Sequence, residues 1–350
     1  MKRSWWTPAE FNEKLMHLKN RDKCIKAIRT FFDKQDFLEV ETPILQFSPG
    51  MEPHIFSFRT EYICPLGENN QTYYLHTSPE FTMKKLLVAG LPKIYQITKV
   101  FRNKERSDTH SPEFTMIEWY RAEETYDALM RDCEGLTRDV FRATGRKLAE
   151  FNGMVCDPFA EFEYLSVNDA FKNATGYDLL ETIDDYSSHD PDPTKIREVA
   201  LALGDPSCVP DDNDRWEDIF FRIYLNRIEK KLGQGRATIL YDYPLCLAAL
   251  SRPKPSDPRL AERFEMYMCG LELANAFGEL TDAKAQEDRF VADMNLKQEL
   301  YGETHPIDPD FIDALKHGMP ECTGIALGVD RLVMLAVGAQ VIDQVLWAEV

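Results

Sequence analysis

The chain has 350 residues, of which 59 are Asp or Glu and 41 are Lys or Arg, so its formal charge is −18. This length suffices for one large domain or two smaller ones, and 44% hydrophobic residues exclude a disordered or fibrous protein. The acidic balance argues against a protein whose main work is to neutralise nucleic-acid phosphates.

Neither a membrane anchor nor a disulfide framework is indicated. Eight cysteines are scattered without a C-x-x-C pair, which indicates reduced thiols and a cytoplasmic protein. No apolar run approaches the ~18 residues of a membrane span. Residues 1–10 include basic residues but no apolar stretch after them, so we expect no signal peptide.

The first predicted element is a helix. Thr7, Pro8 and Glu10 predict a capped start, and apolar residues at helical spacing predict a helix over residues 20–35. A short strand over residues 37–43, ended by a proline, is predicted next, followed by a hairpin over residues 54–75 that turns at residues 67–70. A helix over residues 79–89 and two paired strands over residues 94–101 and 114–121 follow.

Residues 178–218 differ from the rest of the chain in charge. They hold 13 acidic residues against three basic ones, a net charge of −10. Such a composition is typical of a surface insertion or a poorly ordered linker. Helical patterns over residues 194–203 and 216–232 favour a helical insertion, which we place at about residues 160–235.

The remaining chain is predicted to alternate between strands and helices. The strands are 237–243, 263–272 and 322–328, and the helices are 282–300 and 330–338. Several long-range antiparallel strands with helices clustered between them predict an α+β fold.

Residues 100–120 are predicted to form a hairpin that presents charged side chains. An apolar strand leads to Arg102, a polar loop contains His110, and the second strand places Phe114 and Glu118 on one face. Guanidinium groups suit phosphate recognition, and residues 84–106 carry a net charge of +6. A hairpin with a solvated charged loop explains this segment about as well.

Two further segments are candidates for ligand binding. Small residues alternate over residues 324–328 and Arg331 follows at a helix start, a pattern that suits an anion but also a tightly packed turn. Carboxylates and an amide recur in an apolar run, at Glu265, Glu272, Asn275 and Glu279. They need metal or cationic partners, and a wet strand face would not easily explain all four.

Together these segments resemble the motifs of class II aminoacyl-tRNA synthetases, most closely those of the lysyl branch. Residues 38–43 resemble motif 1, residues 101–120 motif 2 and residues 324–331 motif 3. Further lysyl-type signatures lie at residues 77–80 and 272–279. The resemblance implies the class II catalytic fold, a mostly antiparallel sheet flanked by helices.

In two features the sequence differs from the lysyl synthetases and resembles their truncated paralogues, the elongation factor P lysine ligases. Only about 20 residues precede the catalytic core, and Ala326 stands where glycine is usual. This resemblance implies a single catalytic domain over residues 1–350 without an anticodon-binding domain. It implies that ATP and Mg²⁺ serve to join (R)-β-lysine, or lysine, to a lysine side chain of elongation factor P. We also expect a homodimer, because of motif 1, and no stable tRNA binding.

The resemblance assigns roles to individual residues. Arg102 would bind the α-phosphate of ATP and Arg331 the γ-phosphate, aided by His110, and these two arginines would be the catalytic residues. Phe114 would stack on adenine. The other residues assigned to ATP are Asn103, Lys104, Glu105, Ser111, Glu272, Leu273 and Gly328.

The substrate and metal assignments also follow from the resemblance. Glu118 and Glu279 would meet the amino groups of the substrate, and Glu265 and Glu272 would hold Mg²⁺. The remaining substrate residues are Ser78, Pro79, Glu80, Tyr120, Asn275 and Ala326. Lys104, Ser111 and Gly278 replace the family's usual glutamate, asparagine, and histidine or serine.

Three alternatives stay open. The first is a lysyl-tRNA synthetase without its anticodon domain, which would transfer to tRNA. The second is a ligase that makes small amides, for which Glu118 and Glu279 would be hard to explain. The third is a non-catalytic regulatory paralogue, which the presence of Arg102, Arg331 and the Mg²⁺ carboxylates disfavours.

Overall fold

The computed structural model describes residues 5–65, 70–186, 188, 190–248 and 250–350. The chain divides into two compact units, and one of the boundaries between them falls within helix α3 (Tyr126–Thr144). Unit 1 comprises residues 1–125, 135–146 and 280–350, and unit 2 comprises residues 126–134 and 147–279. Most of the predicted turn at 67–70 and the first four residues lie outside the described residues.

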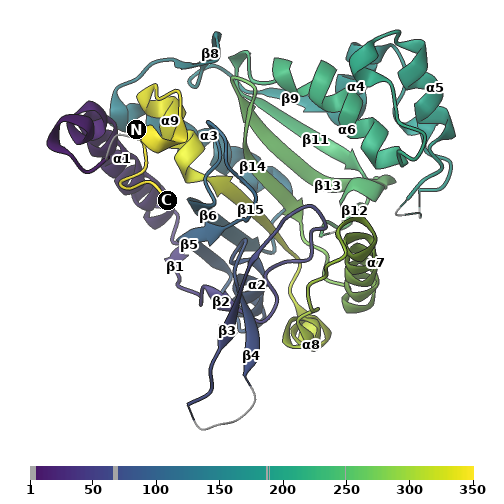
Figure 1. The fold of residues 1–350 in the computed structure, drawn as a ribbon, viewed down its shortest axis with the longest axis horizontal. Helices are drawn as coiled ribbons and strands as arrows, with labels where there is room; N and C mark the ends of the chain where they lie inside the picture. The colour runs from purple at the N-terminus through teal and green to yellow at the C-terminus, as the bar shows by residue number, and fades with distance from the viewer. Residues whose placement is uncertain (1–4, 66–69, 187, 189, 249) are drawn as a thin grey trace. The chain divides into compact units, whose positions relative to one another are not determined.

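The strands of unit 1 pair in two sets (Figure 1). The larger has the order β1-β5-β6-β15, with β1 parallel to β5 and the other pairs antiparallel, and the smaller has the order β2-β4-β3. Their bounds are β1 (Leu38–Glu39), β2 (Leu45–Gln46), β3 (Phe58–Tyr62), β4 (Gln71–Leu75), β5 (Lys93–Phe101), β6 (Glu113–Ala122) and β15 (Cys322–Gly328). The predicted hairpins over 54–75 and 94–121 are thereby confirmed.

The helices of unit 1 pack in two groups, with α1 beside α9 and α2 beside α8 and α7. Their bounds are α1 (Pro8–Asp33), α2 (Glu80–Val88), α7 (Ala283–Tyr301), α8 (Pro309–Gly318) and α9 (Val329–Val337), followed by the 3-10 turn η5 (Ile342–Gln344). A buried ion pair between Arg21 of α1 and Asp330 of α9 links the first group. Arg21 also donates to Thr115 Oγ1 of β6 at 2.9 Å, and Asp330 accepts from the Thr115 amide at 2.7 Å.

The first helix is longer than predicted. It begins at Pro8, with Thr7 in the N-cap position, and continues to Asp33. The Thr7 side chain makes no capping hydrogen bond, so the predicted capping box is wrong. Pro8 needs no amide partner in the first turn, which accounts for the start without that bond.

The strands of unit 2 pair in two sets. The larger set has the order β14-β13-β11-β9, with β12 paired to β13, and the smaller has the order β10-β8-β7. The bounds are β7 (Ala149–Phe151), β8 (Met154–Asp157), β9 (Glu163–Ser166), β10 (Gly235–Arg236), β11 (Thr238–Pro244), β12 (Pro253–Lys254), β13 (Asp257–Met268) and β14 (Leu271–Gly278). Most pairs in both units are antiparallel, which confirms the α+β prediction.

The predicted strand over residues 263–272 is wrong, because the chain turns back within it. β13 ends at Met268 and β14 begins at Leu271. Cys269 and Gly270 between them have φ values of 52° and 71°, the left-handed conformations that a tight hairpin turn requires. The hairpin sets Glu265 directly opposite Asn275.

The acidic segment of unit 2 is a packed helical structure. Its helices are α4 (Val167–Thr175), α5 (Thr194–Ala202) and α6 (Trp216–Arg227), with the 3-10 turns η1 (Leu180–Thr182), η2 (Pro206–Cys208) and η3 (Glu229–Lys231); η4 (Leu245–Leu247) follows β11. Trp216, Phe220 and Phe171 are fully buried and belong to a core that includes Leu240 and Tyr243 of β11. The helical prediction is confirmed, whereas a poorly ordered linker is not observed in the described part of this segment.

Among the helices of the described residues, none combines the length and the apolar character that a membrane span requires.

Candidate active site

Three strands of unit 1 form the floor of the candidate site. Gln96 of β5, Glu118 of β6 and Ala326 of β15 are direct partners in the sheet and form one row across it. Partners that lie directly opposite point to the same face of a sheet. Ala326 and Gly328 are partly exposed, whereas Leu327 between them is buried, so this face is the open one.

The arginine of the predicted motif 2 lies beside the predicted adenine-binding ring. The Arg102 guanidinium carbon is 5.4 Å from the centre of the Phe114 ring. The Arg102 Nε atom is buried and has no hydrogen-bond partner, and the same holds for the Ser111 hydroxyl. Buried polar groups are rarely left without partners in a native protein, so these two atoms fit a site for a polar ligand.

The structure brings the predicted His110 and Arg331 together. Nη2 of Arg331 lies 2.5 Å from Nε2 of His110, and the Ser107 hydroxyl lies 2.7 Å from Nδ1. Burial, with the charges of Arg331 and Arg102, lowers the pKa of His110 to about 4. The imidazole is therefore neutral at pH 7, so Nε2 accepts from Arg331 and Nδ1–H donates to Ser107.

The other predicted motif 2 residues belong to the loop after β5. The Lys104 amide donates to Asn103 Oδ1 at 2.8 Å, and Lys104 has a φ of 65°. The Lys104 ammonium lies 3.4 Å from the centre of the Phe56 ring, a cation–π contact. Glu105 is partly exposed in this loop.

Much of the positive charge in residues 84–106 is neutralised by acidic partners. Ion pairs link Lys84 to Glu80, Lys85 to Asp308 and Asp310, Lys99 to Glu113, and Arg106 to Asp343. The net charge of +6 in this segment is therefore a poor measure of what is available to a nucleotide.

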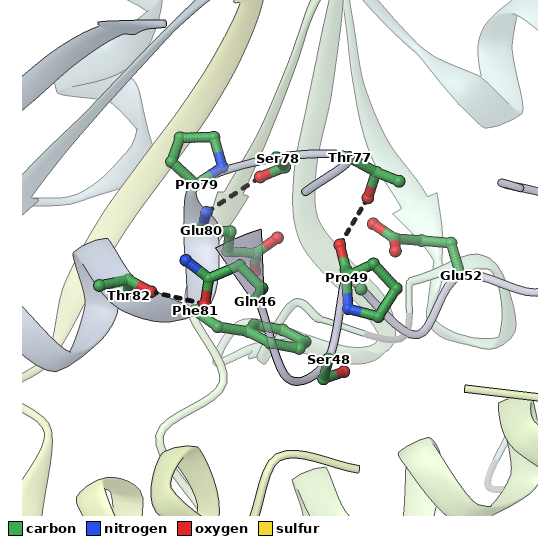
Figure 2. Close-up of a pocket in the computed structure, with 11 residues that line it drawn as sticks. Gln46, Ser48, Pro49, Glu52, Thr77, Ser78, Pro79, Glu80, Phe81 and Thr82 are labelled. Carbon is green, nitrogen blue, oxygen red and sulfur yellow. Dashed lines mark hydrogen bonds between the residues drawn. The ribbon is translucent and has the colours of Figure 1, made fainter. Parts of the chain in front are cut away.

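A pocket lies at the start of α2 and includes the predicted Ser78, Pro79 and Glu80 (Figure 2). The Glu80 amide donates to Ser78 Oγ at 3.0 Å. Glu52 also lines this pocket, and its carboxylate rests against Gly50, where a Cβ atom would lie 2.8 Å from Oε2. Burial and the charge of Glu80 raise the pKa of Glu52.

Glu118 is a buried carboxylate held by hydroxyl groups. Ser78 donates a short hydrogen bond to Oε1, and Tyr120 donates to Oε2 at 3.1 Å. Glu118 is only 2% exposed. Burial, and then the charge of Glu80, raise the pKa of Glu118 to about 8, which marks a carboxylate that favours a cationic ligand.

In unit 2, Glu265 is the centre of a buried polar cluster. Oε2 accepts from the Tyr243 hydroxyl at 2.6 Å and from the Tyr267 hydroxyl at 2.5 Å, and Oε1 accepts from Arg263 at 2.7 Å. Burial and the Glu265 charge raise the pKa of both tyrosines, so they remain protonated donors.

The other predicted residues of unit 2 follow on β14. Glu272 is the sheet partner of Tyr267, and the buried Leu273 is the extra residue where the register shifts. The Asn275 Oδ1 atom is buried without a hydrogen-bond partner, and Glu279 is 1% exposed. Asn275 therefore fits a polar ligand on the same grounds as Arg102.

The departure at Gly278 has a structural reason. A Cβ atom there would lie 2.2 Å from Glu262 Oε2, and Glu262 is held by Arg252 Nε at 2.7 Å. The Glu262–Arg252 pair occupies the space that a larger side chain would need.

The donor atoms of unit 2 are compatible with Mg²⁺. Carboxylate oxygens are the ligands that Mg²⁺ prefers, and a carboxylate has about four acceptor positions, of which Glu265 uses three. One acceptor position of Glu265 therefore remains for a cation, in addition to the carboxylate oxygens of Glu272. No group of three or more His, Cys, Asp or Glu side chains arranged to hold a metal is found among the residues that the structure describes.

Residues 8–347 match the family of tRNA synthetases class II (D, K and N). The chain therefore belongs to this class II synthetase family, and the fold prediction is confirmed. Its relatives include proteins named elongation factor P–(R)-β-lysine ligase. The one from Vibrio cholerae is 37% identical over 99% of this chain and 98% of its own. The one from Mannheimia succiniciproducens is 37% identical over 93% of this chain and 92% of its own. The one from Haemophilus influenzae is 36% identical over 97% of this chain and 96% of its own.

Sequence reasoning missed two polar side chains near the predicted residues. Glu52 lies in an irregular segment whose sequence gave no signal of a site, and only the fold brings it close to Glu80. Gln96 was hidden in an apolar strand, although a lone amide in such a strand was a signal that could have found it.

Proposed function

We propose that this protein is an ATP-dependent ligase that activates (R)-β-lysine, or lysine, and transfers it to a lysine side chain of elongation factor P. Identity of 36–37% over at least 92% of each relative's length is the observation that carries this proposal. The buried Glu118 carboxylate, beside a face that is open at Ala326 and Gly328, supports an amine-bearing substrate.

In the first step, a carboxylate oxygen of the substrate attacks the α-phosphorus of ATP. The bond from that phosphorus to the bridging oxygen of pyrophosphate breaks, which leaves an aminoacyl-adenylate. Arg102 binds the α-phosphate and Arg331 the γ-phosphate, and His110 holds the Arg331 guanidinium in place. Positioning and charge neutralisation of this kind supply most of the catalysis in phosphoryl chemistry.

The metal ion belongs to the same proposal. Glu265 and Glu272 would hold Mg²⁺, which neutralises phosphate charge when it is bound. Phe114 packs against the adenine ring. Glu118 and Glu279 bind the substrate's amino groups, and Ser78, Tyr120 and Asn275 orient the substrate. The other residues that the family resemblance assigns to ATP or to the substrate contact the same ligand in this proposal.

In the second step, the unprotonated amine of the acceptor lysine attacks the carbonyl carbon of the adenylate. The bond from that carbon to the AMP oxygen breaks, and the amine loses a proton to solvent. The product is an amide on elongation factor P, and AMP leaves.

ATP–pyrophosphate exchange with (R)-β-lysine and with lysine tests the first step. Offering the labelled adenylate to elongation factor P or to tRNA then tests the acceptor. We expect labelled elongation factor P. Labelled tRNA without labelled protein would instead support a synthetase that lacks its anticodon domain.

Replacing Ala326 with glycine is expected to shift the preference between lysine and (R)-β-lysine. The Ala326 methyl group stands in the same sheet row as Glu118, and a difference of one carbon is worth ~1–3 kcal/mol in such a pocket. The ratio of kcat/KM for the two substrates in pyrophosphate exchange measures the shift. An unchanged ratio in the Ala326→Gly variant would rule out this role.

We also propose a cytoplasmic homodimer that binds no tRNA stably. Large apolar side chains are exposed around motif 1, with Leu38, Leu45 and Phe47 at 53%, 41% and 48%. Covering such side chains is a common reason for association. Sedimentation of the full chain is expected to give twice the monomer mass of 40.5 kDa, and Phe47→Asp is expected to weaken the dimer. A monomer at micromolar concentration would contradict the proposal.

A further inference from the structure

Gln96 is a buried amide in the middle of β5. It is 3% exposed, and it lies directly opposite Glu118 in the β5–β6 pair. The two side chains therefore point to the same face of the sheet, with Ala326 on the other side of Glu118 in the same row.

The Gln96 side chain is not accounted for by the fold. Its Oε1 atom is buried without a hydrogen-bond partner. A buried acceptor in this condition destabilises the fold, and an amide that served only to fill the sheet could be replaced by an apolar side chain without loss of stability. Either a ligand or an ordered water molecule satisfies such an atom.

The position along β6 indicates which part of the substrate lies here. Glu118 lies four positions after Phe114 on β6, and Arg102 lies beside Phe114. At ~3.4 Å per residue of strand, Glu118 and its partner Gln96 are ~14 Å from the end that holds Arg102. The reacting carboxylate belongs at the Arg102 end, so the amine at the far end of the substrate belongs at Glu118.

We propose that Gln96 binds the terminal ammonium group of the amino-acid substrate together with Glu118, an inference that rests on the proposed function. An ammonium group has three donors. Glu118 accepts one or two of them beside its bonds from Ser78 and Tyr120, and Gln96 Oε1 accepts another.

The neutral amide suits this place better than a third carboxylate would. Glu80 already acts on Glu118 as a like charge, and burial disfavours the ionised form of Glu118 further. A second acceptor without charge adds a hydrogen bond to the ammonium group and no repulsion.

The test combines Gln96→Leu with truncated substrates. (R)-β-lysine carries both amino groups, 6-aminohexanoate keeps only the terminal one, and (R)-3-aminohexanoate keeps only the one near the carboxylate. Calorimetric titration of the full chain is expected to show about 10- to 100-fold weaker binding of the first two, because hydrogen bonds to charged groups are worth this much. Binding of (R)-3-aminohexanoate is expected to stay within about twofold.

Gln35→Leu is the matched control. The Gln35 amide oxygen already accepts from Arg121 at 2.6 Å, so its loss is expected to lower the stability of the chain and to leave all three affinities unchanged. Gln96→Leu is expected to leave the stability equal or higher, because it removes an unpaired polar atom.

Three results would overturn the inference. Equal weakening of all three ligands by Gln96→Leu would indicate general damage to the pocket. Unchanged binding of (R)-β-lysine would indicate a water-bound amide. Loss of stability without loss of affinity would indicate a structural role. A parent protein that binds neither (R)-β-lysine nor lysine would instead refute the proposed function itself.

Discussion

Replacing Arg331 with alanine is expected to lower the rate of ATP–pyrophosphate exchange by about 10³-fold or more. Arg331 stands in the first turn of α9, where free amide groups already favour anions, and His110 orients its guanidinium. Removing one charged group that stabilises phosphoryl transfer typically costs 10³- to 10⁵-fold. The exchange assay at saturating lysine or (R)-β-lysine measures the loss.

Two further variants make this result specific. Arg106→Ala removes another arginine, which pairs with Asp343 at 3.1 Å at the surface, and it is expected to retain activity within about threefold. Arg331→Lys keeps the charge without the planar fork, so it is expected to recover only part of the rate. If Arg331→Ala retains exchange within about fivefold of the parent while folded, the proposed phosphate role is refuted.

Replacing Glu118 with glutamine is expected to weaken the binding of (R)-β-lysine by about 10²-fold or more at pH 9. Glutamine preserves the shape and can keep the Ser78 and Tyr120 contacts, but it cannot carry the charge that the ammonium group needs. Unpairing a buried ion pair costs about 3–5 kcal/mol. Calorimetric titration measures the change, and Glu61→Gln on the exposed strand β3 is the control.

The pH dependence gives a second signature of Glu118. Because its pKa is about 8, few of the unliganded molecules carry an ionised Glu118 at pH 7 and most of them do at pH 9. Affinity for the ammonium group is therefore expected to rise about tenfold over this interval in the parent and to stay flat in Glu118→Gln. A parent profile without this rise would contradict a Glu118 that titrates near pH 8 and binds the ammonium group.

The same shift affects the stability of the unliganded protein. The pKa of Glu118 rises from an ordinary 4.5 to about 8 on folding, so the folded state binds more protons between these values. Stability is therefore lost as the pH rises from about 4.5 to 8. Glu118→Gln avoids this loss, and its melting temperature is expected to exceed that of the parent by more at pH 9 than at pH 5.

The elements predicted best are those whose pattern is local. The alternation around Arg102 and Phe114 predicted β5 and β6, and the small residues before Arg331 predicted β15 and α9. Each of these motifs lies within a stretch of about 20 residues, so its geometry follows from the chain itself.

The errors arose where the local pattern was ambiguous or was not used. The apolar run over 263–272 was interpreted as one strand, although Gly270 offered the turn signal that splits it. Helix α8 was missed, although Asp308 and Pro309 form a recognisable start, with the Asp308 side chain accepting from the Asp310 amide at 3.0 Å.

The candidate site was predictable only as a set of residues. The sequence indicated Glu118 and Ala326 but not that Gln96 completes their row, because sheet register depends on which strands pair. The raised pKa of Glu118 depends on burial and on Glu80, which only the folded chain brings to it.

The buried contacts of Arg21 have a consequence for the order in which this chain folds during translation. Asp330 follows Arg21 by 309 positions, and Arg21 also donates to the carbonyl oxygen of Val345 at 3.2 Å. At 5–20 residues per second, the ribosome needs about 15–60 s to add those residues. Helix α1 therefore emerges long before its partners Asp330 and Val345 exist, whereas unit 2 is fully synthesised by residue 279. The ion pair of Arg21 with Asp330 is therefore among the last contacts of helix α1 to form.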